Sequence, residues 1–374
     1  MRPLGIRAVG AAAITAMLVV GCSASGGSGR VGDGSGGGAI AASVSGRLKP
    51  VLDTGGAWDS VRAILVTVGG KPVFEKYYHS TSDEYHNVFS VTKSVLSTLI
   101  GIAVGEGRIG GVDETLAHLL PQYAKGMSPQ VARTTLKQVL TMTAGFTDEA
   151  DPHAFAFMGA DDPTQAVLRS ANGTPGKFAY SDAGAHLVSA ILRTATHQSV
   201  LEYARSKLFD PLGIASKPAT EPIANQDSLQ PHTVADFVWP VDIQGLHLGW
   251  SGLKLRPSDM AKLGNLYLNG GVWKGRRIVP ADWVRDATAS HVKTPGLAAP
   301  NGSYGYEWWA GAARGEPEFG AVGFGGQRIL VAPGLHAVIV VATEADPSDP
   351  AGEGISPDQS ARIAEEIISA LKNQ

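Results

Sequence analysis

Cysteine is almost missing from this chain, which contains a single one, Cys22. A lone thiol forms no intramolecular disulfide, so a disulfide-stapled fold is excluded. A basic excess is missing too: 31 Lys and Arg stand against 34 Asp and Glu, for a net charge of −3. That balance argues against nucleic acid as a partner. The histidines show neither His-x-His nor His-Glu-x-x-His spacing, so no metal site is indicated and no cofactor is expected.

What is present describes a large globular protein. Hydrophobic residues make up 44% of the 374 positions, and charged residues only 17%. A chain of this size buries a substantial core, and its 47 glycines and low charge fit a secreted bacterial protein. Neither an internal repeat nor a second linker interrupts residues 51–374, so we expect one catalytic unit with two lobes there.

The first fifty residues differ in composition from the rest. Arg2 and Arg7 precede an apolar stretch, residues 8–21, that is too short for an ordinary transmembrane helix. The stretch ends in Val-Val-Gly-Cys, which resembles a bacterial lipobox and implies cleavage before Cys22 followed by acylation of its thiol and its new amine. The alternative is an ordinary signal peptide with an incidental cysteine. Residues 22–50 are rich in Gly and Ser and predict a flexible tether on the extracytoplasmic face of the cell membrane.

Strand patterns gather at both ends of the remaining chain. A hairpin is predicted over residues 61–68 and 72–78, and four further strands over 304–310, 319–323, 328–332 and 336–342. The segments between read as helices, namely 135–146, 164–172, 183–196, 198–208, 258–269 and 280–287, and residues 356–372 form a closing amphipathic helix. The expected fold is α/β of the α+β type. An antiparallel sheet from both chain ends is flanked by helices, and a mainly helical lobe is inserted.

The most informative stretch is residues 87–102. Apolar residues recur there at helical spacing, so a buried helix is predicted from Ser90 onward. Lys93 follows Ser90 on the same face, one turn later. A serine hydroxyl is a weak nucleophile at neutral pH, and an adjacent amine can accept its proton. Taken alone, Ser-x-x-Lys is more often an N-cap serine beside a solvated lysine.

Two later stretches supply complementary chemistry. Tyr180 immediately precedes a predicted helix, where its hydroxyl can accept and donate a proton; a structural tyrosine is the alternative. Gly323 and Phe324 lie at the end of a predicted strand, where glycine lets a substrate approach the backbone. A strand N–H there, together with the N–H of Ser90, could form an oxyanion hole; a tight turn is the alternative.

In this order the three motifs resemble the serine β-lactamase-like superfamily of class C β-lactamases, DD-peptidases and esterases. Ser90 to Ser94 and Gly323 to Gln327 look most similar to the branch of 6-aminohexanoate-dimer hydrolases and their esterase relatives. The resemblance implies that Ser90 forms an acyl-enzyme with Lys93 as proton partner. It also implies that Tyr180 relays the proton and that the N–H groups of Ser90 and Phe324 hold the oxyanion.

The sequence departs from that family at two places. Asp182 stands where the family has an asparagine, and a carboxylate near Lys93 favours the charged ammonium and shifts base duty toward Tyr180. Ala321 stands where the family has a lysine or histidine, so the cation that would meet a substrate carboxylate is absent. We therefore expect esters or small amides as substrates rather than β-lactams. Arg328 or Lys254 could supply a substitute cation.

The leading hypothesis is a membrane-tethered serine hydrolase. The alternatives are a penicillin-binding or cell-wall-binding lipoprotein with little turnover, and a structural envelope protein. Four tryptophans either wall the pocket or belong to the core: Trp239, Trp250, Trp308 and Trp309.

Overall fold

The computed structural model describes residues 35–146, 154–224, 237–294, 302–346 and 354–373. The expected signal peptide, Cys22 and the first part of the expected tether lie outside these residues. Within them, no helix is both long and apolar enough to cross a bilayer.

The centre of the molecule is an eight-stranded sheet in which every neighbouring pair is antiparallel. The first hairpin pairs with the last strand, in register Ile64 with Val341, so the sheet is built from both ends of the chain as expected. Its strands in spatial order are β2 (Lys71–Tyr77), β1 (Val61–Val68), β14 (Ala337–Thr343), β13 (Gln327–Ala332), β12 (Glu316–Gly323), β11 (Trp309–Ala313), β10 (Ser303–Tyr304) and β9 (Val292–Lys293).

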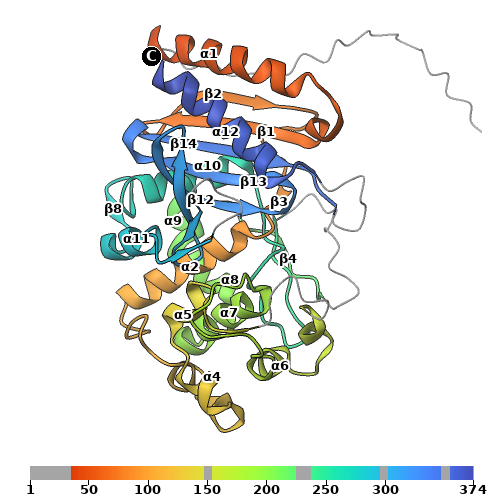
Figure 1. Cartoon of the computed structure of the whole chain (residues 1–374), viewed down its shortest axis with the longest axis vertical. Coiled ribbons are helices and arrows are strands. Elements are labelled where there is room, and N and C mark those ends of the chain that lie inside the picture. Colours follow the sequence, from red (N-terminus) through yellow and green to blue (C-terminus); the bar gives the residue numbers. More distant parts are fainter. Residues whose placement is uncertain (1–34, 147–153, 225–236, 295–301, 347–353, 374) are drawn as a thin grey trace, which may run out of the picture.

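Two helices from the chain ends cover one face of this sheet (Figure 1), α1 (Ser35–Leu52) and α12 (Pro357–Lys372). Helix α1 corrects the expected tether, because from Ser35 onward the chain is folded. The Gly-rich composition concealed a stripe at helical spacing, in which Val44, Leu48 and Val51 are buried. Val44 and Leu48 belong to the same apolar cluster as Ile363 and Ile367 of α12.

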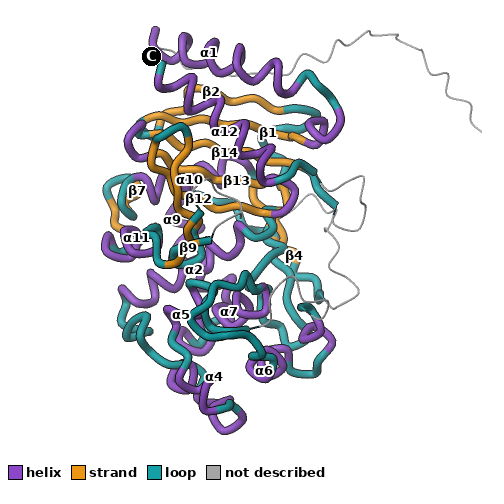
Figure 2. Tube along the Cα trace, in the orientation of Figure 1, coloured by secondary structure: helices purple, strands orange, loops and turns teal. Residues whose placement is uncertain are grey.

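The other face of the sheet carries α10 (Pro257–Leu268) and the helical lobe (Figures 1 and 2). The lobe is built around α2 (Val91–Gly105) and α7 (Asp182–Thr196), which pack on each other. Around them lie α3 (Leu116–Leu119), α4 (Pro129–Arg133), α5 (Leu136–Leu140), α6 (Pro163–Arg169), α8 (Val200–Ala204), α9 (Asp210–Leu212) and α11 (Ala281–Ala287). Three short ladders complete the chain: β3 (His86–Asn87) with β6 (Lys254–Leu255), β4 (Ala219–Thr220) with β5 (Phe237–Val238), and β7 (Val272–Trp273) with β8 (Arg276–Arg277).

Several expected elements are wrong in extent: the helix expected over 164–172 ends at Arg169, and the one expected over 198–208 is α8 followed by a π-helical turn. The helix expected over 135–146 ends at Leu140, because Met142 adopts a positive φ of 57° that an α-helix does not accommodate. The strand expected over 304–310 is interrupted at residues 305–308 by the turn between β10 and β11, where Glu307 has φ 58°. The helices expected over 183–196, 258–269, 280–287 and 356–372 agree with α7, α10, α11 and α12 to within a residue or two at each end.

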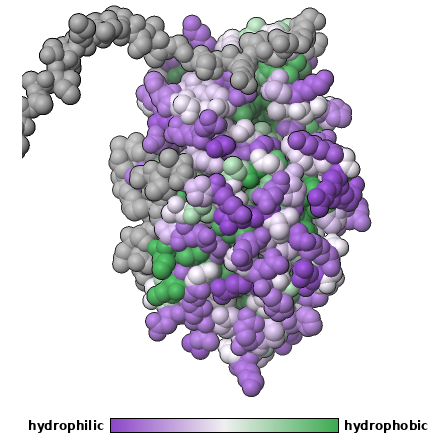
Figure 3. All heavy atoms as spheres, turned by 180° about the vertical axis from the view of Figure 1, so that it is seen from behind, coloured by the Kyte–Doolittle hydropathy of each residue, from purple (hydrophilic) through white to green (hydrophobic). Residues whose placement is uncertain are grey.

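The surface seen from behind is mostly hydrophilic over the helical lobe, with hydrophobic residues gathered in small areas (Figure 3). Among the described residues, the large hydrophobic side chains that are exposed are Ile223, Ile243 and Phe324. Isolated exposure of this kind is ordinary, but Phe324 lies beside the predicted nucleophile.

Candidate active site

The predicted nucleophile stands at the first turn of α2. Ser90 is the residue before the helix, and its hydroxyl caps no backbone N–H group. Lys93 lies one turn further, and its Nζ donates a hydrogen bond to Ser90 Oγ at 2.9 Å. The hydroxyl is therefore left to the lysine rather than to helix capping, which is the more common role of a serine at this position.

The backbone just before Ser90 is strained. Phe89 has φ 46°, which is uncommon for a bulky residue. The turn is fixed on both sides: the Phe89 N–H donates to Asn87 Oδ1 at 3.0 Å, and the Val88 N–H donates to the Leu253 carbonyl at 2.9 Å. Such residues persist only where the surroundings hold them, and they concentrate at functional sites.

Lys93 is buried, with 1% of its surface exposed, and it is surrounded by oxygen atoms. Besides Ser90, its Nζ lies 2.5 Å from Asp182 Oδ1 and donates to the Trp250 carbonyl at 3.1 Å. A buried ammonium requires a counter-ion and hydrogen-bond acceptors. The site supplies both, and this arrangement favours the charged form of the lysine.

The loop that brings the Trp250 carbonyl is fastened to α7. Gly249 packs so closely that a Cβ atom there would lie 2.2 Å from the Ala185 carbonyl oxygen. One turn after Asp182, the buried His186 ring makes an edge contact with the Trp250 ring, at 5.1 Å between centroids, and its Nε2 lies 3.1 Å from Asp242.

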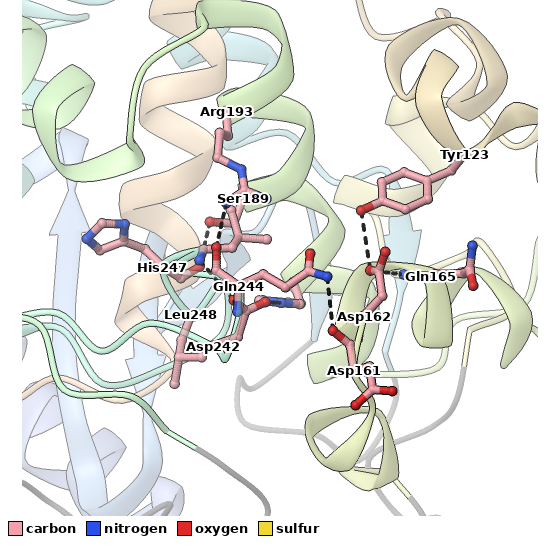
Figure 4. A network of polar contacts seen from close by, with 12 residues as sticks. Tyr123, Asp161, Asp162, Gln165, Ser189, Arg193, Asp242, Gln244, His247 and Leu248 are labelled. Atoms are coloured by element: carbon pink, nitrogen blue, oxygen red, sulfur yellow. Dashed lines mark hydrogen bonds and ion pairs between the residues drawn. The ribbon is translucent and has the colours of Figure 1, made fainter.

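Hydrogen bonds within this loop support Asp242 in turn. Its Oδ1 accepts from the backbone N–H groups of Gln244 and Leu246, and Ser189 of α7 donates to the His247 carbonyl (Figure 4). Burial raises the pKa of the Asp242 carboxyl. The hydrogen bond from His186 and the two backbone N–H groups lower this pKa by more, so the net shift is downward. The loop and helix thus position Asp182 and the Trp250 carbonyl together.

The aromatic ring of Tyr180 faces the ammonium group of Lys93. Lys93 Nζ lies 4.8 Å from the ring centroid, and the ring stacks on Trp309 at 5.9 Å. Two of the four tryptophans therefore adjoin the site, Trp250 and Trp309. The others, Trp239 and Trp308, are core residues with at most 1% of their surface exposed.

The end of β12 lies against the turn that carries Ser90. A Cβ atom on Gly323 would lie 2.3 Å from the Val88 carbonyl oxygen, so only glycine fits there. The exposed Phe324 ring contacts Phe89 edge-on at 5.4 Å. The strand end and the nucleophile turn are thus adjacent, as the oxyanion hypothesis requires.

The proposed substitute cations lie in different places. Arg328 is buried and directed toward α12, where it donates to Ser360 Oγ and the Pro357 carbonyl, each at 3.0 Å. Its guanidinium is therefore engaged away from Ser90. Lys254 pairs with Asn87 in the β3–β6 ladder; burial lowers its pKa, and the charge of Glu84 opposes that shift.

The sequence interpretation missed two groups that complete the site. The Trp250 carbonyl is a backbone atom, which side-chain motifs do not reveal. Glu307 has 1% of its surface exposed, and burial raises its pKa well above the ordinary value, while Lys93 opposes that rise. A charged residue inside the aromatic run 304–309 was the signal, because Glu is almost never fully buried without a partner.

In the described parts of the chain, no group of three or more side chains has the composition of a metal site.

Comparison with known proteins agrees with this architecture. The 6-aminohexanoate-dimer hydrolase of Paenarthrobacter ureafaciens is 25% identical over 300 residues, which is 74% of this chain and 71% of that protein. A penicillin-binding protein homologue from Caulobacter crescentus superposes with a TM-score of 0.66 at 18% identity, over 92% of this chain and 100% of its own. The hydrolase EstCE1 superposes with a TM-score of 0.68 at 15% identity, over 89% of this chain and 99% of its own. Because the profile of the family described as Beta-lactamase matches residues 60–358, this chain belongs to that family of serine hydrolases.

Proposed function

We propose that this protein hydrolyses esters or small amides through an acyl-enzyme formed on Ser90. The observation that carries the proposal is the hydrogen bond from Lys93 Nζ to Ser90 Oγ, in a site where the hydroxyl has no capping role. Such a pair, supported by a third group, is the usual arrangement of an activated nucleophile. Asp182 is that third group.

The reaction would proceed in two halves. In the first, Ser90 Oγ bonds to the substrate carbonyl carbon, the bond to the leaving alcohol or amine breaks, and the serine proton passes to that leaving group. In the second, water attacks the acyl carbon, gives one proton back to Ser90 and releases the carboxylic acid. The N–H groups of Ser90 and Phe324 would stabilise the oxyanion in both halves.

Tyr180 is the better candidate for the general base. Asp182 keeps Lys93 charged, and an ammonium 4.8 Å from the tyrosine ring favours the phenolate form over the neutral phenol. We expect Tyr180→Phe to lower kcat by about 10²–10⁴-fold, the usual contribution of a general base. The control is Tyr123→Phe, which removes a hydroxyl that donates to Asp162 in the helical lobe. If Tyr180→Phe keeps more than a third of wild-type kcat, Lys93 must be the base.

The substrate class follows from a missing charge. Ala321 is buried in β12 and offers no cation to a substrate carboxylate, and Arg328 is engaged under α12. The rings near the Ser90–Lys93 pair are instead aromatic: Phe89, next to Ser90, contacts Phe324, and Tyr180, beside Lys93, stacks on Trp309. Uncharged acyl groups suit such surroundings, and β-lactams, which carry a carboxylate, do not.

Parallel assays of the full chain with p-nitrophenyl butyrate and a chromogenic cephalosporin test the substrate class. The proposal expects a kcat/KM for the ester at least a hundredfold above that for the cephalosporin. Equal turnover would overturn it. In that case Lys254→Met would show whether Lys254 is the substitute cation.

The second candidate is a penicillin-binding protein with little turnover. It is favoured by the fold shared with the Caulobacter homologue. A stable mass increase by one penicillin molecule, with no ester turnover, would support this candidate instead.

We also propose that lipid on Cys22 holds the enzyme at the extracytoplasmic face of the cell membrane. The support is the lipobox-like sequence Val-Val-Gly-Cys after a short apolar stretch. Cells expressing the full chain should incorporate an alkyne-labelled fatty acid into it and lose the label with Cys22→Ser. Equal labelling of both forms would contradict this.

A further inference from the structure

Three features of Glu307 are each unfavourable for the stability of the fold. Its backbone is left-handed, with φ 58°, a conformation unfavourable for a residue with a side chain. Its surface is 99% buried, and neither carboxyl oxygen has a hydrogen-bond partner. An unpartnered polar group in the interior destabilises a fold, and an ionised one does so far more.

The turn does not need this side chain. Its hydrogen bonds use the backbone alone, because the Glu307 N–H donates to the Leu140 carbonyl at 3.0 Å and its carbonyl accepts from Ser94 Oγ at 2.6 Å. Glycine would satisfy the same turn without strain. A feature that is costly and not required locally points to a role outside the turn.

The surroundings indicate that role. Ser94 follows Lys93 directly, so the Ser94 hydrogen bond joins Glu307 to the first turn of α2. The charged groups that act on the Glu307 carboxyl are Lys93 of α2 and Asp182 of α7. With no donor to stabilise a carboxylate, the surroundings favour the protonated carboxyl group. Burial accordingly raises its pKa well above the usual range, against the opposing charge of Lys93.

We propose that Glu307 is a positioning residue of the active site: as an uncharged acid it leaves Asp182 as the sole counter-ion of Lys93. This inference rests on the proposed function, because it concerns the same nucleophile. One negative charge balances the ammonium, so that the site still favours the Tyr180 phenolate that accepts the serine proton and the oxyanion that develops during attack. A second carboxylate would oppose both. Ionisation of Glu307 at high pH would therefore slow attack by Ser90.

The first experiment follows the rate at which a fluorophosphonate labels Ser90, from pH 6 to pH 10. It compares wild type with Glu307→Gln, which has the same shape and cannot ionise. The control is Glu318→Gln. Glu318 is also a buried acid, with its pKa raised to about 7 by burial, but it faces Arg328 and Glu365 rather than Lys93.

We expect the wild-type labelling rate to fall at alkaline pH. In Glu307→Gln, the midpoint of that decrease should lie at least one pH unit higher. Glu318→Gln should keep the wild-type profile. Superimposable profiles for wild type and Glu307→Gln would overturn the inference.

A second experiment does not depend on activity. Between pH 5 and 9, the melting temperature of Glu307→Gln should rise relative to wild type, because the buried acid must hold a proton that the unfolded chain releases. In an Asp182→Asn background this gain should vanish, since Glu307 would then become the counter-ion of Lys93. An equal gain in both backgrounds would overturn the inference. A wild type that the probe never labels would refute the proposed function, and the melting experiment would still decide the role of Glu307.

Discussion

The ammonium of Lys93 dominates the energetics at the scale of single residues. It has left water almost completely and has Asp182, Ser90 Oγ and the Trp250 carbonyl as partners. Removing one partner of a buried ion pair leaves the other charge uncompensated, which costs far more than removing both. The pair therefore orients Lys93 in the site, and the fold is destabilised when either partner is removed alone.

Asp182→Asn should lower the free energy of unfolding by about 3–5 kcal/mol, because it removes one partner of the buried ion pair. The double variant Lys93→Met with Asp182→Asn should recover most of that loss. Urea unfolding at pH 7 measures both. If the double variant is less stable than Asp182→Asn alone, the ion pair does not carry the energetics assigned to it.

Sequence predicted the local part of this site and missed the distant part. Ser90 and Lys93 lie one turn apart on the same helix, so their spacing alone placed them together. Asp182 was expected near Lys93 only through the family resemblance. The Trp250 carbonyl and Glu307 come from loops far along the chain, and their approach depends on tertiary packing that a spacing pattern does not encode.

At the scale of elements, the contact between β12 and the nucleophile turn is the most constrained. Gly323 touches the Val88 carbonyl, one residue before the strained Phe89. Any side chain at Gly323 has to push the strand end away from the turn or distort the turn itself. Either movement would displace the N–H groups of the proposed oxyanion hole.

Gly323→Ala should therefore lower kcat/KM by about a hundredfold or more, the usual cost of losing one oxyanion donor. Gly126→Ala is the matched control, because a Cβ atom there would meet no atom within 4 Å. Ester hydrolysis by the two variants checks this. Activity of Gly323→Ala within threefold of Gly126→Ala would contradict the proposed geometry.

Helix α1 shows where composition misleads. The Gly and Ser content of residues 22–50 predicted a tether, but spacing rather than composition decides whether a helix has a face to bury. Leu48 has 2% of its surface exposed and lies in the cluster formed with α12.

Leu48→Ala should cost about 2–5 kcal/mol of unfolding free energy, as truncations in a packed core do. Ser45→Ala, on the exposed side of α1, should stay within about 0.5 kcal/mol of wild type. Both are measured by urea unfolding. Equal stability of the two variants would mean that α1 does not pack as described.

At the scale of the whole molecule, the sheet and the inserted helical lobe were predictable, but the limits of the lobe's short helices were not. The strands at both chain ends are rich in β-branched residues and have few ways to bury their apolar faces. Pairing them in one antiparallel sheet covered by helices buries those faces. The lobe is made of short helices whose limits depend on tertiary contacts, such as the Met142 turn that ends α5.

Buried histidines make the whole fold sensitive to acid. Burial, assisted by the positive charges of Arg205 and Arg193, lowers the pKa of His247 to about 4. The unfolded chain binds that proton near pH 6.5, so stability is lost as the pH falls from 6.5 through 4.

The loss from His247 alone should reach about 3 kcal/mol, from a pKa difference of about 2.5 units. Melting temperatures recorded between pH 4 and 7 should therefore decline less steeply for His247→Gln than for wild type. Parallel curves would show that His247 is not buried uncharged.

The most direct test of an acyl-enzyme on Ser90 is hydrolysis of p-nitrophenyl butyrate by the full chain, beside Ser90→Ala, with mass spectrometry of the rapidly quenched reaction. We expect turnover by wild type, a transient butyryl adduct on the peptide that contains Ser90, and loss of both in the variant. Equal turnover by the two proteins, or an adduct on another residue, would contradict it.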